Sequence, residues 1–192
     1  MQAMKNISVY PILFLVCLSA CKTSKPVAKA IQPDNKEVVT EPASQETDFS
    51  DPSTFILGYF SLNKLLLPPY STWYTSGYDD YKYNSDAVDK LKEIGKSDLS
   101  VNIIMGTWCS DSRREVPRLM RVLNTGNFPQ DKIQLIGVDK EKNSPVANFD
   151  SFNIQKVPTI IFYKNNIELG RIIETPTTSL EQDIVNILTK SE

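Results

Sequence analysis

Cys109 is the residue of this chain with the clearest capacity for chemistry. It lies within GTWCSDS, residues 106–112, directly after an apolar run and directly before a helical pattern. A cysteine at such a strand-to-helix junction meets unpaired backbone N–H groups and the positive end of the helix dipole, which stabilise a thiolate. Because the thiolate is the reactive form of cysteine, we expect Cys109 to be a nucleophile.

Ser112 stands where a dithiol redox motif would carry its second cysteine. Its hydroxyl could donate a hydrogen bond to the Cys109 thiolate, or it could bond the backbone at the start of the helix. Both interpretations remain open, but a serine cannot close a disulfide. A mixed disulfide on Cys109 would therefore need a thiol from another molecule to resolve it.

Composition excludes several classes of site. The 192-residue chain has no histidine, which rules out Cys-His and Ser-His-Asp machinery and His-ligated metal or haem. It has three cysteines, one of which is expected to leave on maturation, so a Cys-only zinc site is also excluded. We expect no metal and no cofactor. The formal net charge of −2 gives no global field that favours nucleic acid, and no such partner is expected.

The N-terminus has the pattern of a signal peptide over residues 1–20. Lys5 precedes an apolar stretch, residues 7–18, that is too short to span a membrane as a helix. The stretch ends in Leu-Ser-Ala-Cys21, which resembles the bacterial lipobox, where the cysteine is lipidated. We expect a lipid anchor on Cys21 and a location in the cell envelope. Lys22, with no acidic run beside it, favours the periplasmic face of the outer membrane, by resemblance to known sorting signals.

Two segments separate this anchor from the regular part of the chain. Residues 21–50 are polar, with few large apolar side chains, and are predicted to be a flexible tether. Residues 51–84 are rich in aromatic residues, which we expect to pack as an N-terminal extension on the domain, although a ligand-stacking surface is an alternative. These aromatic residues are Phe55, Tyr59, Phe60, Tyr70, Trp73, Tyr74, Tyr78, Tyr81 and Tyr83.

Residues 85–192 alternate between helical and strand periodicity. Strands are expected over residues 99–105, 133–138, 157–163 and 167–173. Helices are expected from Ser85, as its cap, to about residue 96, over residues 110–124, and at the end of the chain, where Thr178 and Glu181 open the last helix as a capping box. Residues 143–153 are expected to form a loop with one short helix. This order predicts an α/β domain. Its mixed four-stranded sheet would be flanked by helices on both faces.

Four features, in this order along the chain, resemble the thioredoxin superfamily. They are Trp108-Cys109 after the first core strand, Pro117 eight residues after Cys109, Val157-Pro158-Thr159 at the third strand, and Gly170 in the last strand. The resemblance covers about residues 85–190 and implies a thioredoxin-like fold. The stretch around Cys109 also resembles a bacterial lipoprotein subgroup with a Cys-x-Asp-Ser motif, in which Ser112 would be a regular feature.

The resemblance implies roles for three further residues. Trp108 would partly cover the thiol and offer a flat contact surface, although simple core packing is an alternative. Pro158 would follow a cis peptide bond and place the Val157 backbone against Cys109, where a substrate chain could dock as an added strand. One departure is Ile103, which stands where thioredoxins usually bury an aspartate that aids release of the mixed disulfide.

Three functions follow as hypotheses. The first is thiol–disulfide exchange through Cys109 in the CxxS motif, with protein disulfides or oxidised thiols as substrates and an external reducing thiol as partner. The second is a non-catalytic binding module in the envelope. The third is peroxide reduction, for which Thr107 and Arg113 are present but at the wrong spacing. Three arginines (Arg114, Arg118 and Arg121) fall on one face of the same helix. They form either a solvated face or a basic patch.

Overall fold

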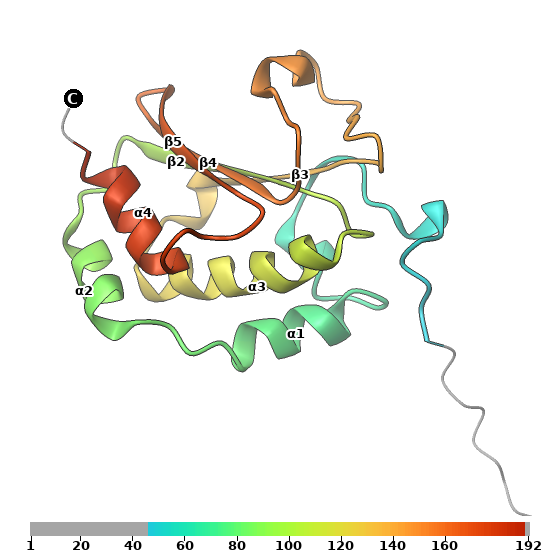
Figure 1. The fold of residues 1–192 in the computed structure, drawn as a ribbon, viewed down its shortest axis with the longest axis horizontal. Coiled ribbons are helices and arrows are strands. Elements are labelled where there is room, and N and C mark those ends of the chain that lie inside the picture. The colour runs from blue at the N-terminus through green and yellow to red at the C-terminus, as the bar shows by residue number, and fades with distance from the viewer. Residues whose placement is uncertain (1–45, 191–192) are drawn as a thin grey trace, which may run out of the picture. The chain divides into compact units, whose positions relative to one another are not determined.

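A five-stranded mixed sheet lies at the centre of the structure (Figure 1). The computed structural model describes residues 46–190. The strands are β1 (Gly58–Phe60), β2 (Leu99–Met105), β3 (Ile133–Gly137), β4 (Thr159–Lys164) and β5 (Ile167–Ile173). They lie in the order β1-β3-β2-β4-β5, with β2 and β3 parallel and the other neighbouring pairs antiparallel. This mixed α/β architecture is consistent with the thioredoxin-like fold.

The expected four strands are present, and β1 adds a fifth that the sequence did not predict. β1 is only three residues long and pairs Gly58 with Gly137 of β3. A strand this short shows no alternating pattern. Gly137 is required at this position, since a Cβ atom there would lie 2.0 Å from the carbonyl oxygen of Ile56.

The four α-helices of residues 46–190 cover the same face of the sheet, so the prediction of helices on both faces is wrong (Figure 1). They are α1 (Ser71–Asp79), α2 (Ser85–Glu93), α3 (Ser110–Thr125) and α4 (Leu180–Leu188). Their apolar side chains join one core with the sheet residues that point the same way, among them Val101, Ile103 and Phe162. No helix among residues 46–190 is long and apolar enough to cross a bilayer.

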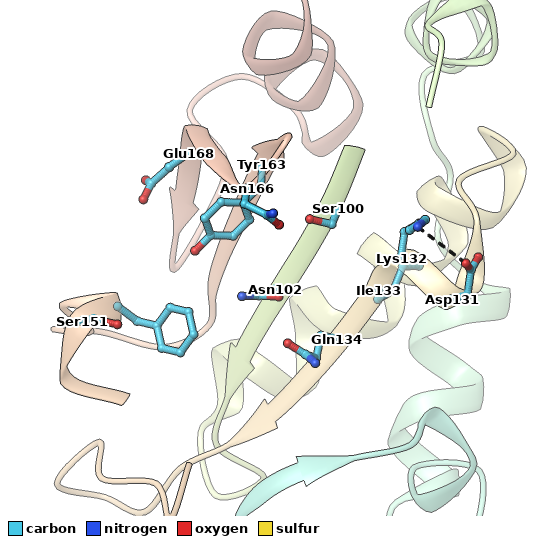
Figure 2. A pocket seen from close by; sticks show the side chains of 11 residues that line it. Ser100, Asn102, Asp131, Lys132, Ile133, Gln134, Ser151, Tyr163, Asn166 and Glu168 are labelled. Atoms are coloured by element: carbon cyan, nitrogen blue, oxygen red, sulfur yellow. Dashed lines mark ion pairs between the residues drawn. The ribbon is translucent and has the colours of Figure 1, made fainter. Parts of the chain in front are cut away.

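The opposite face of the sheet is covered by the segment between β3 and β4. This segment contains one short 3-10 helix, Phe149–Phe152, and packs on a small cluster that includes Ile104 and Ile161. It leaves one end of the face open as a polar groove of about 600 Å³, where Ser100, Asn102 and Gln134 project from the strands (Figure 2). Because this end of the sheet face is polar and solvated, the sequences of these strands are not continuous apolar runs.

The aromatic extension does more than pack rings on the surface of the domain. Phe49 lies inside the segment predicted to be a tether, yet its ring packs 6.1 Å from Tyr70 and 6.5 Å from Trp73. The packed body therefore begins before residue 51. Buried Tyr70 and Tyr74 belong to the main core. The helices α1 and α3 lie so close together at Gly77 that a Cβ atom there would be 2.7 Å from the Pro117 side chain.

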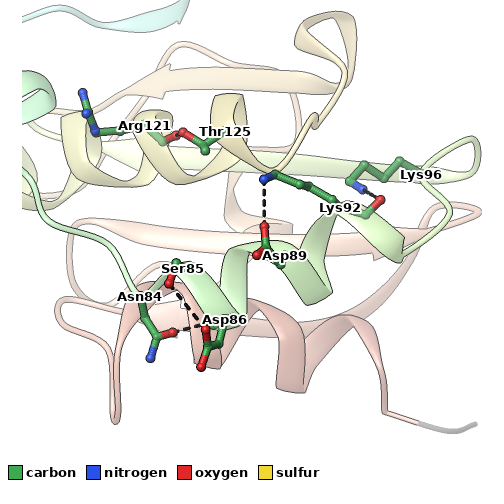
Figure 3. Close-up of polar contacts among 9 residues, drawn as sticks. Asn84, Ser85, Asp86, Asp89, Lys92, Lys96, Arg121 and Thr125 are labelled. Carbon is green, nitrogen blue, oxygen red and sulfur yellow. Dashed lines mark hydrogen bonds and ion pairs between the residues drawn. The ribbon is translucent and has the colours of Figure 1, made fainter.

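Helix α2 shows how local signals set helix ends (Figure 3). Asn84, and not Ser85 as predicted, is the N-cap, because its side chain accepts a hydrogen bond from the N–H of Ala87 at 3.1 Å. At the other end, Lys96 Nζ donates to the carbonyls of Leu91 and Ile94 at 2.6 and 2.8 Å. A lysine in this position satisfies carbonyls that lack partners in the helix.

Helix α4 also begins differently from the prediction. Ser179 is the N-cap and accepts from the N–H of Gln182 at 3.3 Å, so Thr178 and Glu181 do not form a capping box. Glu181 is instead buried, and Thr178 donates its hydroxyl to Asp183 at 2.6 Å. A Ser or Thr at either of two adjacent positions fits the capping pattern, and packing selects between them.

Candidate functional site

Cys109 lies at the junction of β2 and α3, as the sequence predicts. It is the N-cap residue of a 16-residue helix, with extended backbone angles (φ −83°, ψ 123°). Its N–H donates to the carbonyl of Gly106 at 3.0 Å, and its own carbonyl accepts the first helical hydrogen bond, from Arg113, at 3.0 Å. The side chain is half-buried, so the sulfur is held by the fold without being sealed from solvent. The backbone N–H groups at the start of this long helix, and the positive end of its dipole, lie next to the residue.

The segment before β4 faces this sulfur. The Val157–Pro158 peptide bond is cis, and Cys109 Sγ donates a hydrogen bond to the carbonyl of Val157 at 3.3 Å. Neighbouring hydrogen bonds hold the segment in place. Glu174 N–H donates to the carbonyl of Pro158 at 2.8 Å, and the hydroxyl of Thr159 donates to the carbonyl of Lys156 at 2.7 Å. The thiol and the predicted docking segment, 48 residues apart in sequence, therefore form one site.

Trp108 lies beside the thiol with its indole anchored. Nε1 donates to the carbonyl of Val138 at 3.0 Å, and the ring centroid lies 6.5 Å from that of Phe55. The residue is half-buried and packs on the same small cluster as Cys109. Trp108 is therefore both a packing residue and a partly accessible wall of the site.

Ser112 is fully buried, and its hydroxyl oxygen accepts a hydrogen bond from the N–H of Gly106 at 3.3 Å. Among the described residues, no hydrogen bond joins Ser112 to Cys109. Of the two interpretations left open by the sequence, this geometry favours the bond to the backbone. Ser112 thus ties the start of α3 to the end of β2.

The arginines of α3 are engaged by neighbours and do not form an open basic patch. Arg114 contacts Asp111 at 2.7 Å and Glu115 at 2.6 Å. The hydrogen bond that Arg114 donates to Glu115, together with its contact with Asp111, raises the pKa of the Arg114 guanidinium. Arg118 lies 3.2 Å from Glu115 and over the Tyr81 ring at 5.4 Å.

Arg121 is held in the same way by the tyrosines of the extension. It donates to the carbonyl of Tyr78 at 3.1 Å, and its guanidinium lies 5.4 Å from the Tyr78 ring and 5.8 Å from the Tyr83 ring. Cation–π contacts of this kind fix both partners. The aromatic extension and the arginine helix, treated as separate features in the sequence, therefore form one interface.

Thr107 is a site residue that sequence reasoning assigned only to the peroxide hypothesis. It is buried, donates its hydroxyl to the carbonyl of Thr54 at 2.9 Å, and accepts from the N–H of Ile56 at 3.4 Å. Arg113 donates to the carbonyls of Thr107 and Trp108 at 2.9 and 3.0 Å. Both side chains thus hold the backbone around Cys109. No sequence spacing signals the contact with residues 54–56, since it joins segments 51 and 53 residues apart.

Within residues 46–190, no group of three or more Cys, Asp or Glu side chains is placed to hold a metal ion. Cys109 is the free cysteine of this part of the chain. Cys17 and the predicted lipidation residue Cys21 lie outside the described residues, as does the predicted signal peptide.

Comparison with known proteins gives a limited result. No family model matches the chain. Over 108 residues the chain is 31% identical to thioredoxin Y, chloroplastic, of Oryza sativa subsp. japonica. The match covers 56% of this chain and 61% of the relative, so the chain spans about three fifths of the length of the curated relative that it matches. The chain is thus similar to a thioredoxin over part of its length.

Two solved structures are distant neighbours. A protein of unknown function from Pseudomonas aeruginosa has a TM-score of 0.49 and 15% identity, covering 69% of this chain and 90% of that chain. An HIV epitope scaffold has a TM-score of 0.48 and 15% identity, covering 69% of this chain and 91% of that chain. Neither similarity bears on function.

Proposed function

We propose that this protein carries out thiol–disulfide exchange through one nucleophile, Cys109, and that a thiol from outside the chain completes each cycle. The observation that supports this proposal most is the position of the Cys109 sulfur. It lies at the N-terminus of α3, half-buried, and 3.3 Å from the Val157 carbonyl beside a cis proline. Similarity to a thioredoxin over 108 residues agrees with this chemistry.

The cycle balances with two external thiols. The Cys109 thiolate attacks one sulfur of a substrate disulfide, forming a new S–S bond and releasing the other sulfur as a thiolate that takes up a proton. An external thiolate then attacks the Cys109 sulfur and releases the second substrate thiol. A second external thiolate regenerates Cys109 and leaves as a disulfide with the first. The substrate gains two electrons, and the two external thiols lose them.

Each part of the site has a role in this cycle. The start of α3 presents backbone N–H groups beside the sulfur that attacks in the first step and leaves in the last. The backbone at Val157 offers a strand edge on which a substrate polypeptide docks. Trp108 shields one side of the sulfur. Because Ser112 cannot form a disulfide, the mixed disulfide persists until an external thiol arrives.

The decisive experiment treats the full chain, solubilised in detergent, with oxidised glutathione and analyses the product by mass spectrometry. We expect an adduct of one glutathione on Cys109, which added reduced thiol removes. The matched control is Cys109→Ala, in which no glutathione adduct should map to the peptide that carries residue 109. Failure of Cys109 to react faster than free cysteine would contradict the proposal.

The binding-module alternative gives a different result with the same variant. If Cys109→Ala captures the same partners as the wild type and keeps its cellular phenotype, the thiol is not required. The protein would then act as an interaction scaffold. Loss of partner capture in this variant, with the fold intact by circular dichroism, supports exchange through the thiol.

We also propose that the domain is tethered to the cell envelope. This rests on the sequence alone: the signal-peptide pattern, the lipobox-like Cys21 and the polar segment that follows. Two or more acyl chains anchor a protein stably. Cys21→Ala is expected to move the protein from the membrane fraction to the soluble fraction, and an unchanged distribution would contradict lipid anchoring. Separation of inner and outer membranes tests the proposed periplasmic face of the outer membrane.

A further inference from the structure

Arg113 binds the three consecutive carbonyl groups of the loop that leads into α3. Its guanidinium nitrogen Nη1 donates to the carbonyls of Thr107 and Trp108 at 2.9 and 3.0 Å. Its backbone N–H donates to the carbonyl of Cys109 at 3.0 Å. One residue thus fixes the direction of each peptide carbonyl from Thr107 to Cys109. Because a hydrogen bond from a charged donor is stronger than a neutral one, the side-chain contacts hold this loop firmly.

The position of the Cys109 sulfur depends on the same backbone. The Cys109 N–H donates to the carbonyl of Gly106 at 3.0 Å, so the residue is bonded through both its N–H and its carbonyl. From this fixed backbone the side chain reaches Val157, whose carbonyl accepts a hydrogen bond from the sulfur at 3.3 Å. A displacement of about 1 Å at a reacting atom is enough to lower a rate strongly, so the loop must be held in place.

The ring of Phe49 lies against the Arg113 guanidinium. The distance from Cζ of Arg113 to the centroid of the ring is 4.9 Å, which is within the range of a cation–π contact. Two aromatic neighbours hold the ring in turn, since its centroid lies 6.1 Å from that of Tyr70 and 6.5 Å from that of Trp73. Tyr70 is buried in the main core, so the Phe49 ring is anchored to the body of the domain.

Arg113 differs in this respect from the next arginine of α3. Arg114 is held by carboxylates, with Asp111 at 2.7 Å and Glu115 at 2.6 Å. Within residues 46–190, the ion pairs of α3 include none with Arg113. Carboxylates therefore do not set the position of its guanidinium, and the Phe49 ring takes their place.

We propose that Phe49 is a positioning residue for the Cys109 thiol and that it acts through Arg113. The ring holds the guanidinium, the guanidinium holds the loop before Cys109, and the loop keeps the sulfur against the Val157 carbonyl. The inference rests on the proposed thiol–disulfide exchange and adds a residue that controls its rate. Phe49 lies outside residues 85–190, the part of the chain that resembles the thioredoxin superfamily.

The test measures how fast Cys109 forms a mixed disulfide with a synthetic peptide whose single cysteine carries thionitrobenzoate. Cys109 attacks the peptide sulfur, and thionitrobenzoate leaves as a thiolate. The full chain in detergent is mixed with the peptide and quenched with acid at intervals. Mass spectrometry then quantifies the adduct on the fragment that carries residue 109, so thiols elsewhere in the chain do not contribute.

Three substitutions of Phe49 separate its ring from its bulk. Phe49→Leu and Phe49→Met keep an apolar side chain but remove the ring. Each is expected to lower the rate constant about three- to tenfold, the range that loss of one cation–π contact produces. Phe49→Tyr keeps the ring and should react at about the wild-type rate. Circular dichroism checks that each variant is folded in the assay.

A double-mutant cycle identifies the route of the effect. In an Arg113→Ala background, Phe49→Leu should have no further effect on the rate constant, because the guanidinium through which the ring acts is absent. Arg114→Ala is the matched control, since this neighbour in the same helix pairs with carboxylates. In that background Phe49→Leu should keep its full effect.

The outcomes separate the two proposals. If Phe49→Leu and Phe49→Met react at the wild-type rate, or if Phe49→Tyr is as slow as they are, this inference is overturned while exchange through Cys109 stands. The same conclusion follows if Phe49→Leu keeps its effect in the Arg113→Ala background. If wild-type Cys109 forms no adduct with the peptide, the proposed function fails, and the inference fails with it.

Discussion

At the residue scale, Val157 and Ser112 have different roles around Cys109. Val157 meets the sulfur directly through its carbonyl, whereas Ser112, one helical turn along α3, accepts a hydrogen bond from Gly106. Ser112 therefore supports the loop before the thiol, and the chemistry of the site depends on the sulfur and the backbone around it.

Replacing Ser112 tests this division of roles. Ser112→Ala removes the acceptor of a buried backbone N–H, so we expect the free energy of unfolding to fall by about 1–3 kcal/mol, measured by urea titration. The rate at which iodoacetamide alkylates Cys109 in the folded protein should change less than the stability. A large fall in that rate with unchanged stability would instead show that the Ser112 hydroxyl supports the thiolate.

Ser112→Cys restores the spacing of a dithiol motif. We expect Cys109 and the new thiol to form an internal disulfide under mild oxidation, detected as loss of two hydrogens by mass spectrometry. Adducts of oxidised glutathione on Cys109 should then become transient, because an internal thiol displaces them. Persistence of the adduct in this variant would contradict the proposal that the missing second thiol prolongs the mixed disulfide.

At the element scale, the ends of α2 are set by side chains that the structure identifies (Figure 3). Asn84→Ala should lower the free energy of unfolding by about 1 kcal/mol, since the cap to Ala87 is lost. Ser85→Ala is the matched control one residue away and should have an effect below about 0.5 kcal/mol. Equal effects of the two substitutions, measured by urea titration, would contradict Asn84 as the cap.

The contact of Thr107 with residues 54–56 joins the N-terminal extension to the Cys109 loop. Thr107→Val keeps the side-chain shape but leaves the N–H of Ile56 and the carbonyl of Thr54 without this partner. We expect a loss of about 1–3 kcal/mol in unfolding free energy, while Thr107→Ser, which keeps the hydroxyl, loses less. Equal losses for both variants, measured by thermal and urea unfolding, would show that the hydroxyl does not hold the contact.

At the scale of the whole molecule, the helical face buries tyrosines deeply enough to affect alkaline stability. Burial raises the pKa of Tyr74, and burial together with the neighbouring Glu181 carboxylate raises the pKa of Tyr81. In the unfolded chain both phenols titrate near pH 10. Their contribution to stability is therefore complete below about pH 10 and is lost as pH rises further, because the unfolded state then binds fewer protons.

Urea unfolding between pH 8 and about pH 12 measures this loss, which is at most about 1.4 kcal/mol per pH unit for each phenol. Tyr81→Phe should flatten the fall in stability above about pH 10. Tyr59→Phe, at a side chain that is 55% exposed, serves as control and should follow the wild type. A wild-type stability that stays constant up to about pH 12 would contradict the burial argument.

Local sequence patterns predict much of the fold from residue 85 onward. The bounds of β2 and β5 match the prediction, α3 begins at Ser110, and Cys109 lies at its N-terminus, because periodicity and a strand-to-helix junction are local signals. Helix caps were predicted one residue away from their true positions, since two adjacent residues both fit the capping pattern. The strand β1 was missed because three residues carry no period.

Which elements meet could be learned only from the folded chain. It brought the carbonyl of Val157 to the sulfur, placed all four helices on one face of the sheet, and bonded Thr107 to residues 54–56. It also brought the guanidinium of Arg113 over the ring of Phe49. These contacts join residues far apart in the chain, and their partners are selected by packing complementarity over the whole core. No window of neighbouring residues carries that information.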